Sequence, residues 1–101
     1  MAIYVTSDAH GHVRALDEAL SKISLASDDT LYVLGDMIDR GPDPVGVIKL
    51  VRSLPNARVL KGNHEQIMLD AIIGQDPLDA ETWDINGGWT TRQQLNDMVF
   101  E

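Results

Sequence analysis

The chain has 101 residues, enough for one domain with a modest core and small for an α/β enzyme. Its hydrophobic content of 44% excludes a disordered chain, and the lack of cysteine excludes disulfides and thiolate metal sites. Sixteen acidic residues against 8 basic ones give a formal net charge of −8, which disfavours nucleic acid and anionic membranes as partners.

The first residues lead directly into an apolar segment, without the basic stretch and apolar core of a signal peptide. No apolar run approaches the roughly 20 residues that a membrane-spanning helix needs. We therefore expect a cytoplasmic protein with no membrane partner.

Residues 2–6 are apolar at both odd and even positions, which predicts a strand covered on both faces in a parallel sheet. Residues 12–25 carry apolar side chains at helical spacing, which predicts an amphipathic helix against that sheet. After a turn at 27–29, residues 30–34 repeat the strand pattern.

A second helix is predicted after Gly41-Pro42-Asp43-Pro44, because Asp43 can cap free N–H groups and Pro44 suits a first helical position. It should end before residue 55, and residues 57–60 form a short third strand. The resulting β-α-β-α-β unit should have right-handed crossovers and parallel neighbouring strands.

The last third of the chain is predicted to be mainly helical. Residues 65–73 should form a helix, residues 76–84 a loop or short helical turn, and Asn86-Gly87-Gly88 a turn. Thr90 or Thr91 could cap a last helix that ends near residue 99. The fold class is therefore α/β, a parallel unit with extra C-terminal helices, in one domain over 1–101.

Each predicted strand ends in polar side chains, within the motifs Asp8-Ala9-His10-Gly11, Gly35-Asp36-Met37-Ile38-Asp39-Arg40-Gly41 and Gly62-Asn63-His64-Glu65. The carboxyl ends of parallel strands meet in one crevice, where open α/β sheets bind their ligands. The candidate site residues are Asp8, His10, Asp36, Asp39, Arg40, Asn63 and His64.

Asp8 and His10 lie two apart on a segment predicted to be extended, so both could point to one side and hold a cation. Carboxylate and imidazole ligands suit Mn, Fe or Zn. Asp36 could complete that site and bridge to a second cation, to which Asn63 offers a neutral oxygen. Two such cations would hold a hydroxide and bind phosphate oxygens, which predicts phosphate-ester hydrolysis.

Three further side chains fit this chemistry. The guanidinium group of Arg40 is planar, and its paired N–H donors match two oxygens of one phosphate group. His64 could protonate the leaving alkoxide while Asp39 holds its other ring nitrogen.

The three motifs resemble the phosphoprotein phosphatase branch of the calcineurin-like metallophosphoesterases, in order and approximate spacing. The resemblance implies that Asp8, His10 and Asp36 bind a first metal, and that Asp36 and Asn63 bind a second. It also implies that Arg40 and Asn63 contact the substrate phosphate, and that Asp39 and His64 form the acid pair.

This branch is shared by Ser/Thr protein phosphatases and symmetrical diadenosine tetraphosphatases. The Asn86-Gly87-Gly88 turn with a following threonine is similar to small bacterial members that dephosphorylate proteins. We therefore expect a phosphoserine/phosphothreonine phosphatase that uses metal-bound hydroxide and two divalent cations. Mn is the expected metal, and Fe or Zn are the alternatives. The alternatives are a symmetrical diadenosine tetraphosphatase and a non-catalytic assembly module.

The resemblance implies an α/β/β/α sandwich of four layers, of which this chain supplies about the N-terminal half. It also implies two further metal-binding histidines, whereas this chain has only His10, His12 and His64. We therefore expect a truncated domain with an incomplete second metal site and weak or no activity alone. An uncovered sheet would expose apolar surface, which predicts self-association or a complementing chain.

Overall fold

The structure, a computed structural model, describes residues 1–74 and 76–99. Its sheet has three strands, β1 (Ile3–Thr6), β2 (Thr30–Val33) and β3 (Ala57–Val59), all parallel and in the order β1-β2-β3. Helices α1 (Val13–Ser21) and α2 (Pro44–Arg52) form the two crossovers. The predicted β-α-β-α-β unit is therefore confirmed.

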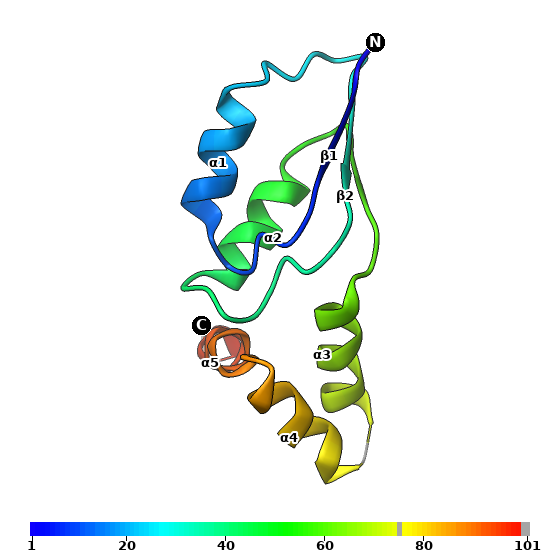
Figure 1. The fold of residues 1–101 in the computed structure, drawn as a ribbon. Coiled ribbons are helices and arrows are strands. Elements are labelled where there is room, and N and C mark those ends of the chain that lie inside the picture. The colour runs from blue at the N-terminus through cyan, green and yellow to red at the C-terminus, as the bar shows by residue number, and fades with distance from the viewer. Residues whose placement is uncertain (75, 100–101) are drawn as a thin grey trace.

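Both crossover helices lie on the same side of the strands (Figure 1). Crossovers of one hand give this result when the strands follow one another across the sheet in chain order. The core lies between these two layers, where Leu31 and Val33 of β2 meet Leu16 of α1 and Val47 of α2. Ile38, in the loop after β2, is 0% exposed and extends this core toward the end of the strands.

The expected cover on the second face of the sheet is not found within the described residues. Ile3 and Val5 of β1 are 62% and 61% exposed. Val5 pairs in register with Tyr32 of β2, which is also exposed, as are Leu34 and Leu60 just beyond the strands. The strands are apolar on both faces, but α1 and α2 cover only one of them.

The α2 start follows the sequence prediction. The Asp43 carboxylate accepts the N–H of Gly46 at 2.9 Å, and Pro44 is the first helical residue. Helix α1 is shorter than predicted, because it ends at Ser21 and Ser24 turns the chain with a φ of +49°.

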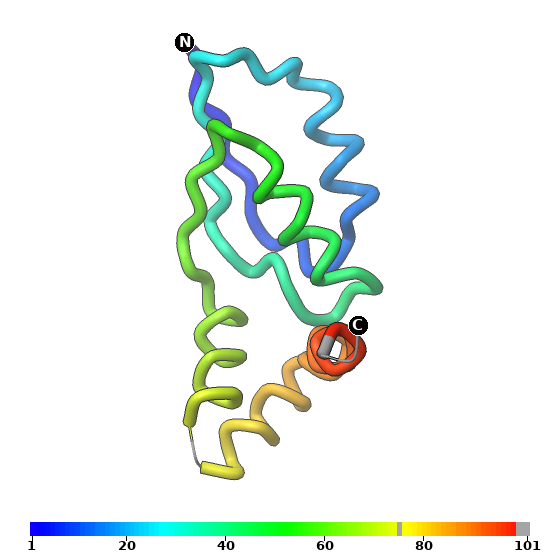
Figure 2. Tube along the Cα trace, turned by 180° about the vertical axis from the view of Figure 1, so that it is seen from behind, coloured from blue at the N-terminus to red at the C-terminus, as the bar shows by residue number. Residues whose placement is uncertain are grey.

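Three further helices follow the sheet: α3 (Asn63–Ile73), α4 (Pro77–Ile85) and α5 (Trp89–Val99). Helix α3 continues from β3 away from the sheet and packs on α4, whereas α5 returns to contact α2 (Figures 1 and 2). The chain is elongated as a result, with extents of 46 × 24 × 20 Å. None of the described helices has the length and apolarity needed to cross a membrane.

The prediction of a loop or short turn at 76–84 was wrong, since α4 is a helix of nine residues. Asp76 caps it by accepting the N–H of Leu78 at 3.0 Å, and Pro77 takes the first helical position. This is the same Asp-Pro signal that identified α2.

The predicted association through the open sheet face can be tested with Val5→Lys. A charge on this face should oppose burial against another protein surface, so the variant should sediment as a monomer at concentrations where the parent chain associates. Leu78→Lys on α4 is the matched control, since Leu78 is 63% exposed and lies outside the sheet. A parent chain that stays monomeric at all concentrations would contradict self-association.

Candidate functional site

The loops that follow β1 and β2 run side by side beyond the sheet. The N–H of Asp8 donates to the carbonyl of Gly35 at 3.2 Å, and the N–H of His10 donates to the carbonyl of Asp36 at 3.0 Å. The parallel pairing of the two strands thus continues into their loops. It places the two polar motifs next to each other.

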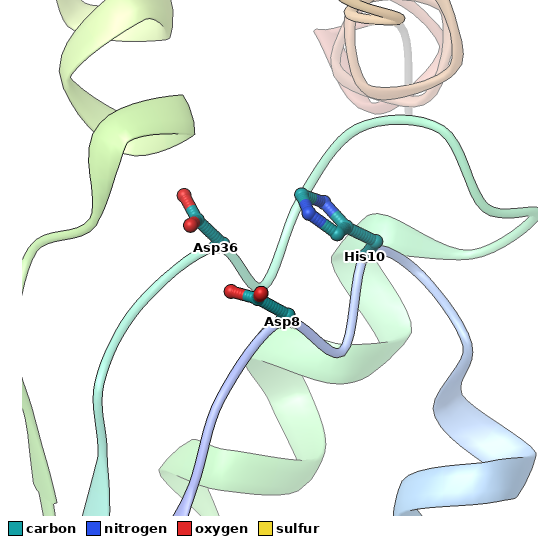
Figure 3. Close-up of side chains that lie close together, drawn as sticks. All are labelled: Asp8, His10 and Asp36. Atoms are coloured by element: carbon teal, nitrogen blue, oxygen red, sulfur yellow. The ribbon is translucent and has the colours of Figure 1, made fainter.

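These loops bring together the carboxylates of Asp8 and Asp36 and the imidazole of His10. One ligand atom of each lies within 4.8 Å of the others, and the three side chains extend toward a common space (Figure 3). The predicted extended conformation of this segment was wrong. Asp8 and His10 have φ values of +59° and +42°, so left-handed turns, rather than strand alternation, bring them together.

The ring of His10 is held by the main chain. Its Nδ1 lies 2.8 Å from the carbonyl oxygen of Ile38. Because a carbonyl can only accept, Nδ1 carries the proton, and Nε2 keeps its lone pair for a ligand. A backbone carbonyl on the far nitrogen is the arrangement commonly found behind metal-binding histidines.

The Asp36 carboxyl group is kept in its charged form. Partial burial raises its pKa, but the N–H of His64, the side chain of Asp8 and the nearby rings of His64 and His10 together lower it below the ordinary value of 3.8. An anionic Asp36 is the form of this side chain that a cation requires.

Glu65 joins the second and third loops, although it carries none of the predicted chemistry. Its buried carboxylate accepts three main-chain N–H groups, those of Asp36 at 2.6 Å, Met37 at 2.9 Å and Gly62 at 2.9 Å. In the sequence, Glu65 stands out only as the last residue of the third motif. Its place three residues after Gly62, where an acidic residue reaches back over a helix start, was the available signal.

Asn63 is the first residue of α3, next to His64, whose N–H donates to Asp36 Oδ1 at 2.8 Å. The third motif therefore touches the cluster through its main chain. The Asn63 side chain is exposed, and its role as a ligand stays a prediction.

Asp39 and His64 form the predicted pair. Nδ1 of His64 lies 2.7 Å from Oδ2 of Asp39, whose side chain is 0% exposed. The ring of His64 also packs edge-on against that of His10, with 4.6 Å between the centroids. The pair thus stands directly beside the cluster of Asp8, His10 and Asp36.

The other oxygen of Asp39 is bound by two residues from the C-terminal helices. Trp83 Nε1 donates to Oδ1 at 3.0 Å, and the Thr91 hydroxyl donates to it at 2.8 Å. Trp83 is buried, and nothing in the sequence near it indicates this hydrogen bond. Thr91 was a candidate helix cap, whereas it lies inside α5 and bonds to Asp39.

Arg40 lies against the turn between α4 and α5. Its N–H donates to the carbonyl of Gly87 at 2.9 Å, and its Nε donates to the carbonyl of Asn86 at 3.4 Å. Gly87 has a φ of +90°, and a Cβ atom there would meet the Arg40 side chain. The predicted turn therefore does lie at the site, where it supports an exposed Arg40.

These features agree with the sequence comparisons. The sequence model of the calcineurin-like phosphoesterase family matches residues 1–99, and the chain belongs to this metal-dependent family of hydrolases.

Particular relatives are of two kinds. The chain is 38% identical over 107 residues to the symmetrical bis(5'-nucleosyl)-tetraphosphatase of Pectobacterium carotovorum, which covers 94% of this chain and 38% of the relative. It is 38% identical over 92 residues to serine/threonine-protein phosphatase 1 of Salmonella typhimurium, which covers 89% of this chain and 41% of that protein.

A similar solved structure is that of a provisionally assigned diadenosine tetraphosphatase, with a TM-score of 0.54 and 32% identity. The match covers 80% of this chain and 40% of that one. The chain thus spans less than half the length of each of these proteins.

The structure predicts that Glu65→Gln weakens binding of Mn²⁺ by about 10- to 100-fold, the usual effect of losing a residue that orients metal ligands. A glutamine has one accepting oxygen and an NH₂ group that would face main-chain N–H donors. Isothermal titration calorimetry of the purified chain measures the affinity.

Glu18→Gln on the exposed face of α1 is the matched control, since it removes the same charge far from the loops. An unchanged affinity in Glu65→Gln, with an unchanged circular dichroism spectrum, would show that the loops hold their shape without this carboxylate.

Proposed function

We propose that this site carries out metal-dependent hydrolysis of phosphate esters or anhydrides. One observation carries the proposal: two carboxylates and an imidazole converge within 4.8 Å, and a buried Asp–His pair stands beside them. A cation-binding cluster next to a proton donor is the combination that phosphoryl transfer to water needs.

The donor set fits a divalent cation. Asp8 and Asp36 supply oxygen, His10 supplies nitrogen with its lone pair free, and such a mixed set suits Mn, Fe or Zn. A bound cation would neutralise phosphate oxygens and make water a better nucleophile. Asn63 is the proposed ligand of a second cation, whose remaining histidines this sequence does not supply.

The protein's own groups would bind the phosphate and move the proton. Arg40, exposed and supported by the turn at Asn86, would pair its guanidinium with two phosphate oxygens. In its doubly protonated form, His64 would keep Nδ1–H on Asp39 and donate the Nε2–H proton to the leaving oxygen.

Two substrate classes remain. The expected phosphoserine or phosphothreonine substrate is favoured by the Salmonella relative, which is named as a protein phosphatase. A dinucleoside tetraphosphate is favoured by relatives from Pectobacterium and Proteus mirabilis, both named as symmetrical tetraphosphatases. Because more of these comparisons point to it, we propose the dinucleoside tetraphosphate as the first substrate to test.

Calorimetric titration of the purified chain with Mn²⁺ tests the metal site. The chain should bind one cation, and His10→Ala should weaken the affinity at least about tenfold, because it removes one of three ligands. His12→Ala is the matched control, since His12 is exposed and its Nδ1 lies 3.2 Å from the carbonyl of Ala9, outside the cluster. Equal affinity in the parent chain and His10→Ala would favour a non-catalytic module.

Turnover of diadenosine tetraphosphate and of a phosphoserine peptide, measured side by side with Mn²⁺ on the full-length gene product, tests the substrate. The proposal expects faster turnover of the nucleotide, and a loss of about 100-fold or more in His64→Gln, the usual contribution of a general acid. The chain of 101 residues alone should show weak or no turnover. Selective turnover of the peptide would reverse the order of the two substrates.

A further inference from the structure

We propose that Trp83 and Thr91 are positioning residues that fix the Asp39 carboxylate and, through it, the orientation and tautomer of the His64 ring. The role of His64 in the reaction rests on the proposed function. The effect of Trp83 and Thr91 on the His64 ring does not depend on it. Side chains from three helices share the two oxygens of Asp39.

Asp39 divides its oxygens between two tasks. Oδ1 accepts from Trp83 Nε1 of α4 and from the Thr91 hydroxyl of α5, and this leaves Oδ2 for Nδ1 of His64 on α3. The carboxylate is 0% exposed, so protein donors must satisfy it. If the two Oδ1 donors were lost, His64 would be the one donor left among these three, and nothing in this set would fix the rotation of the carboxylate about that bond.

Thr91 holds Asp39 at two points. Its hydroxyl donates to Oδ1 at 2.8 Å and accepts the N–H of Asp39 at 2.9 Å, so one atom bridges the side chain and the main chain of the same residue. Asp39 has a φ of +72°, in the left-handed region that non-glycine residues seldom adopt. The Thr91 bridge therefore fixes both the backbone turn and the direction of the carboxylate.

Trp83 reaches Asp39 because the turn after α4 leaves room for its indole. A Cβ atom on Gly88 would meet Cδ1 and Nε1 of Trp83, and the N–H of Gly88 donates to the Trp83 carbonyl at 2.8 Å. The turn thus packs directly on the indole edge that carries the donor. The same turn supports Arg40, so one segment, from Trp83 to Thr91, holds both Asp39 and its neighbour.

The fixed carboxylate in turn selects the His64 tautomer. A carboxylate accepts, so Nδ1 of His64 carries a proton, and Nε2 is the nitrogen that can take up a second proton and pass it to the leaving oxygen. Without a fixed partner, a neutral imidazole would exchange between its two tautomers.

Thr91→Val and Trp83→Phe test the inference. Trp83→Phe removes one donor to Asp39, Thr91→Val removes one donor and one acceptor, and both keep most of the side-chain shape. Nitrogen-15 NMR of the imidazole groups in the chain of 101 residues reports the tautomer of His64 and the exchange of its Nδ1–H with water. The parent chain should show one tautomer and a slowly exchanging Nδ1–H. Each variant should show mixed tautomers or faster exchange of this proton, with the signals of the sheet unchanged.

Thr90→Val is the matched control, because the Thr90 hydroxyl is buried without a hydrogen-bond partner in the described part of the chain. It should leave the His64 signals as in the parent chain. A single tautomer with slow exchange in both Thr91→Val and Trp83→Phe would overturn the inference. If Trp83→Phe fails to fold, Thr91→Val, which is nearly isosteric, decides alone.

Turnover of two phosphate esters with different leaving groups, measured on the full-length protein, separates the positioning role of Thr91 from the proposed proton donation by His64. If His64 protonates the leaving oxygen, Thr91→Val should reduce kcat for phenyl phosphate about tenfold or more, and reduce it less for p-nitrophenyl phosphate, whose leaving group needs little protonation. KM should change little. Changed His64 NMR signals with equal losses on both esters would support the positioning role and reject the proposed proton donation.

Discussion

The arrangement of the site depends on one buried carboxylate that belongs to no proposed ligand set, that of Glu65. It accepts the N–H groups of Asp36, Met37 and Gly62 and so joins the loops after β2 and β3. Holding Asp36 in a left-handed conformation costs about 1–3 kcal/mol. Hydrogen bonds to a charged group contribute about 1.5–3 kcal/mol each, so three of them outweigh that cost.

The two halves of the site are supported in different ways. Main-chain hydrogen bonds hold the cluster of Asp8, His10 and Asp36, because parallel pairing of the first two strands continues into their loops. Side chains from α3, α4 and α5 hold Asp39, which lies deeper and is closed to solvent. The sheet therefore positions the cluster, whereas the helices α3, α4 and α5 position the Asp39–His64 pair.

Much of the fold could be predicted because its signals are local. Two apolar strands, the Asp43-Pro44 helix start and three polar motifs at strand ends define the parallel unit and the residues that gather at its edge. The second Asp-Pro signal, before α4, was present, but the segment was interpreted as a loop or a short helical turn.

What could not be predicted depends on contacts between distant parts of the chain. Trp83 and Thr91 lie 44 and 52 positions from Asp39, and Glu65 lies 28 from Met37. No local spacing pattern contains such pairings. The strand pattern alone predicted cover on both faces, because a strand that is apolar on both sides does not show what covers each side; the open face was expected only from the family resemblance.

At three positions of the site, the amino acid must satisfy two separate requirements, a left-handed backbone and a charged side chain. Asp8, Asp36 and Asp39 all have positive φ, a region that admits mainly glycine, asparagine, aspartate and histidine. Of these four, glycine offers no side-chain donor atom, and only aspartate brings a negative charge. Few members of a saturation library at these three positions would therefore keep the site as it stands, since the main-chain geometry and the need for a charged acceptor reject most substitutes independently.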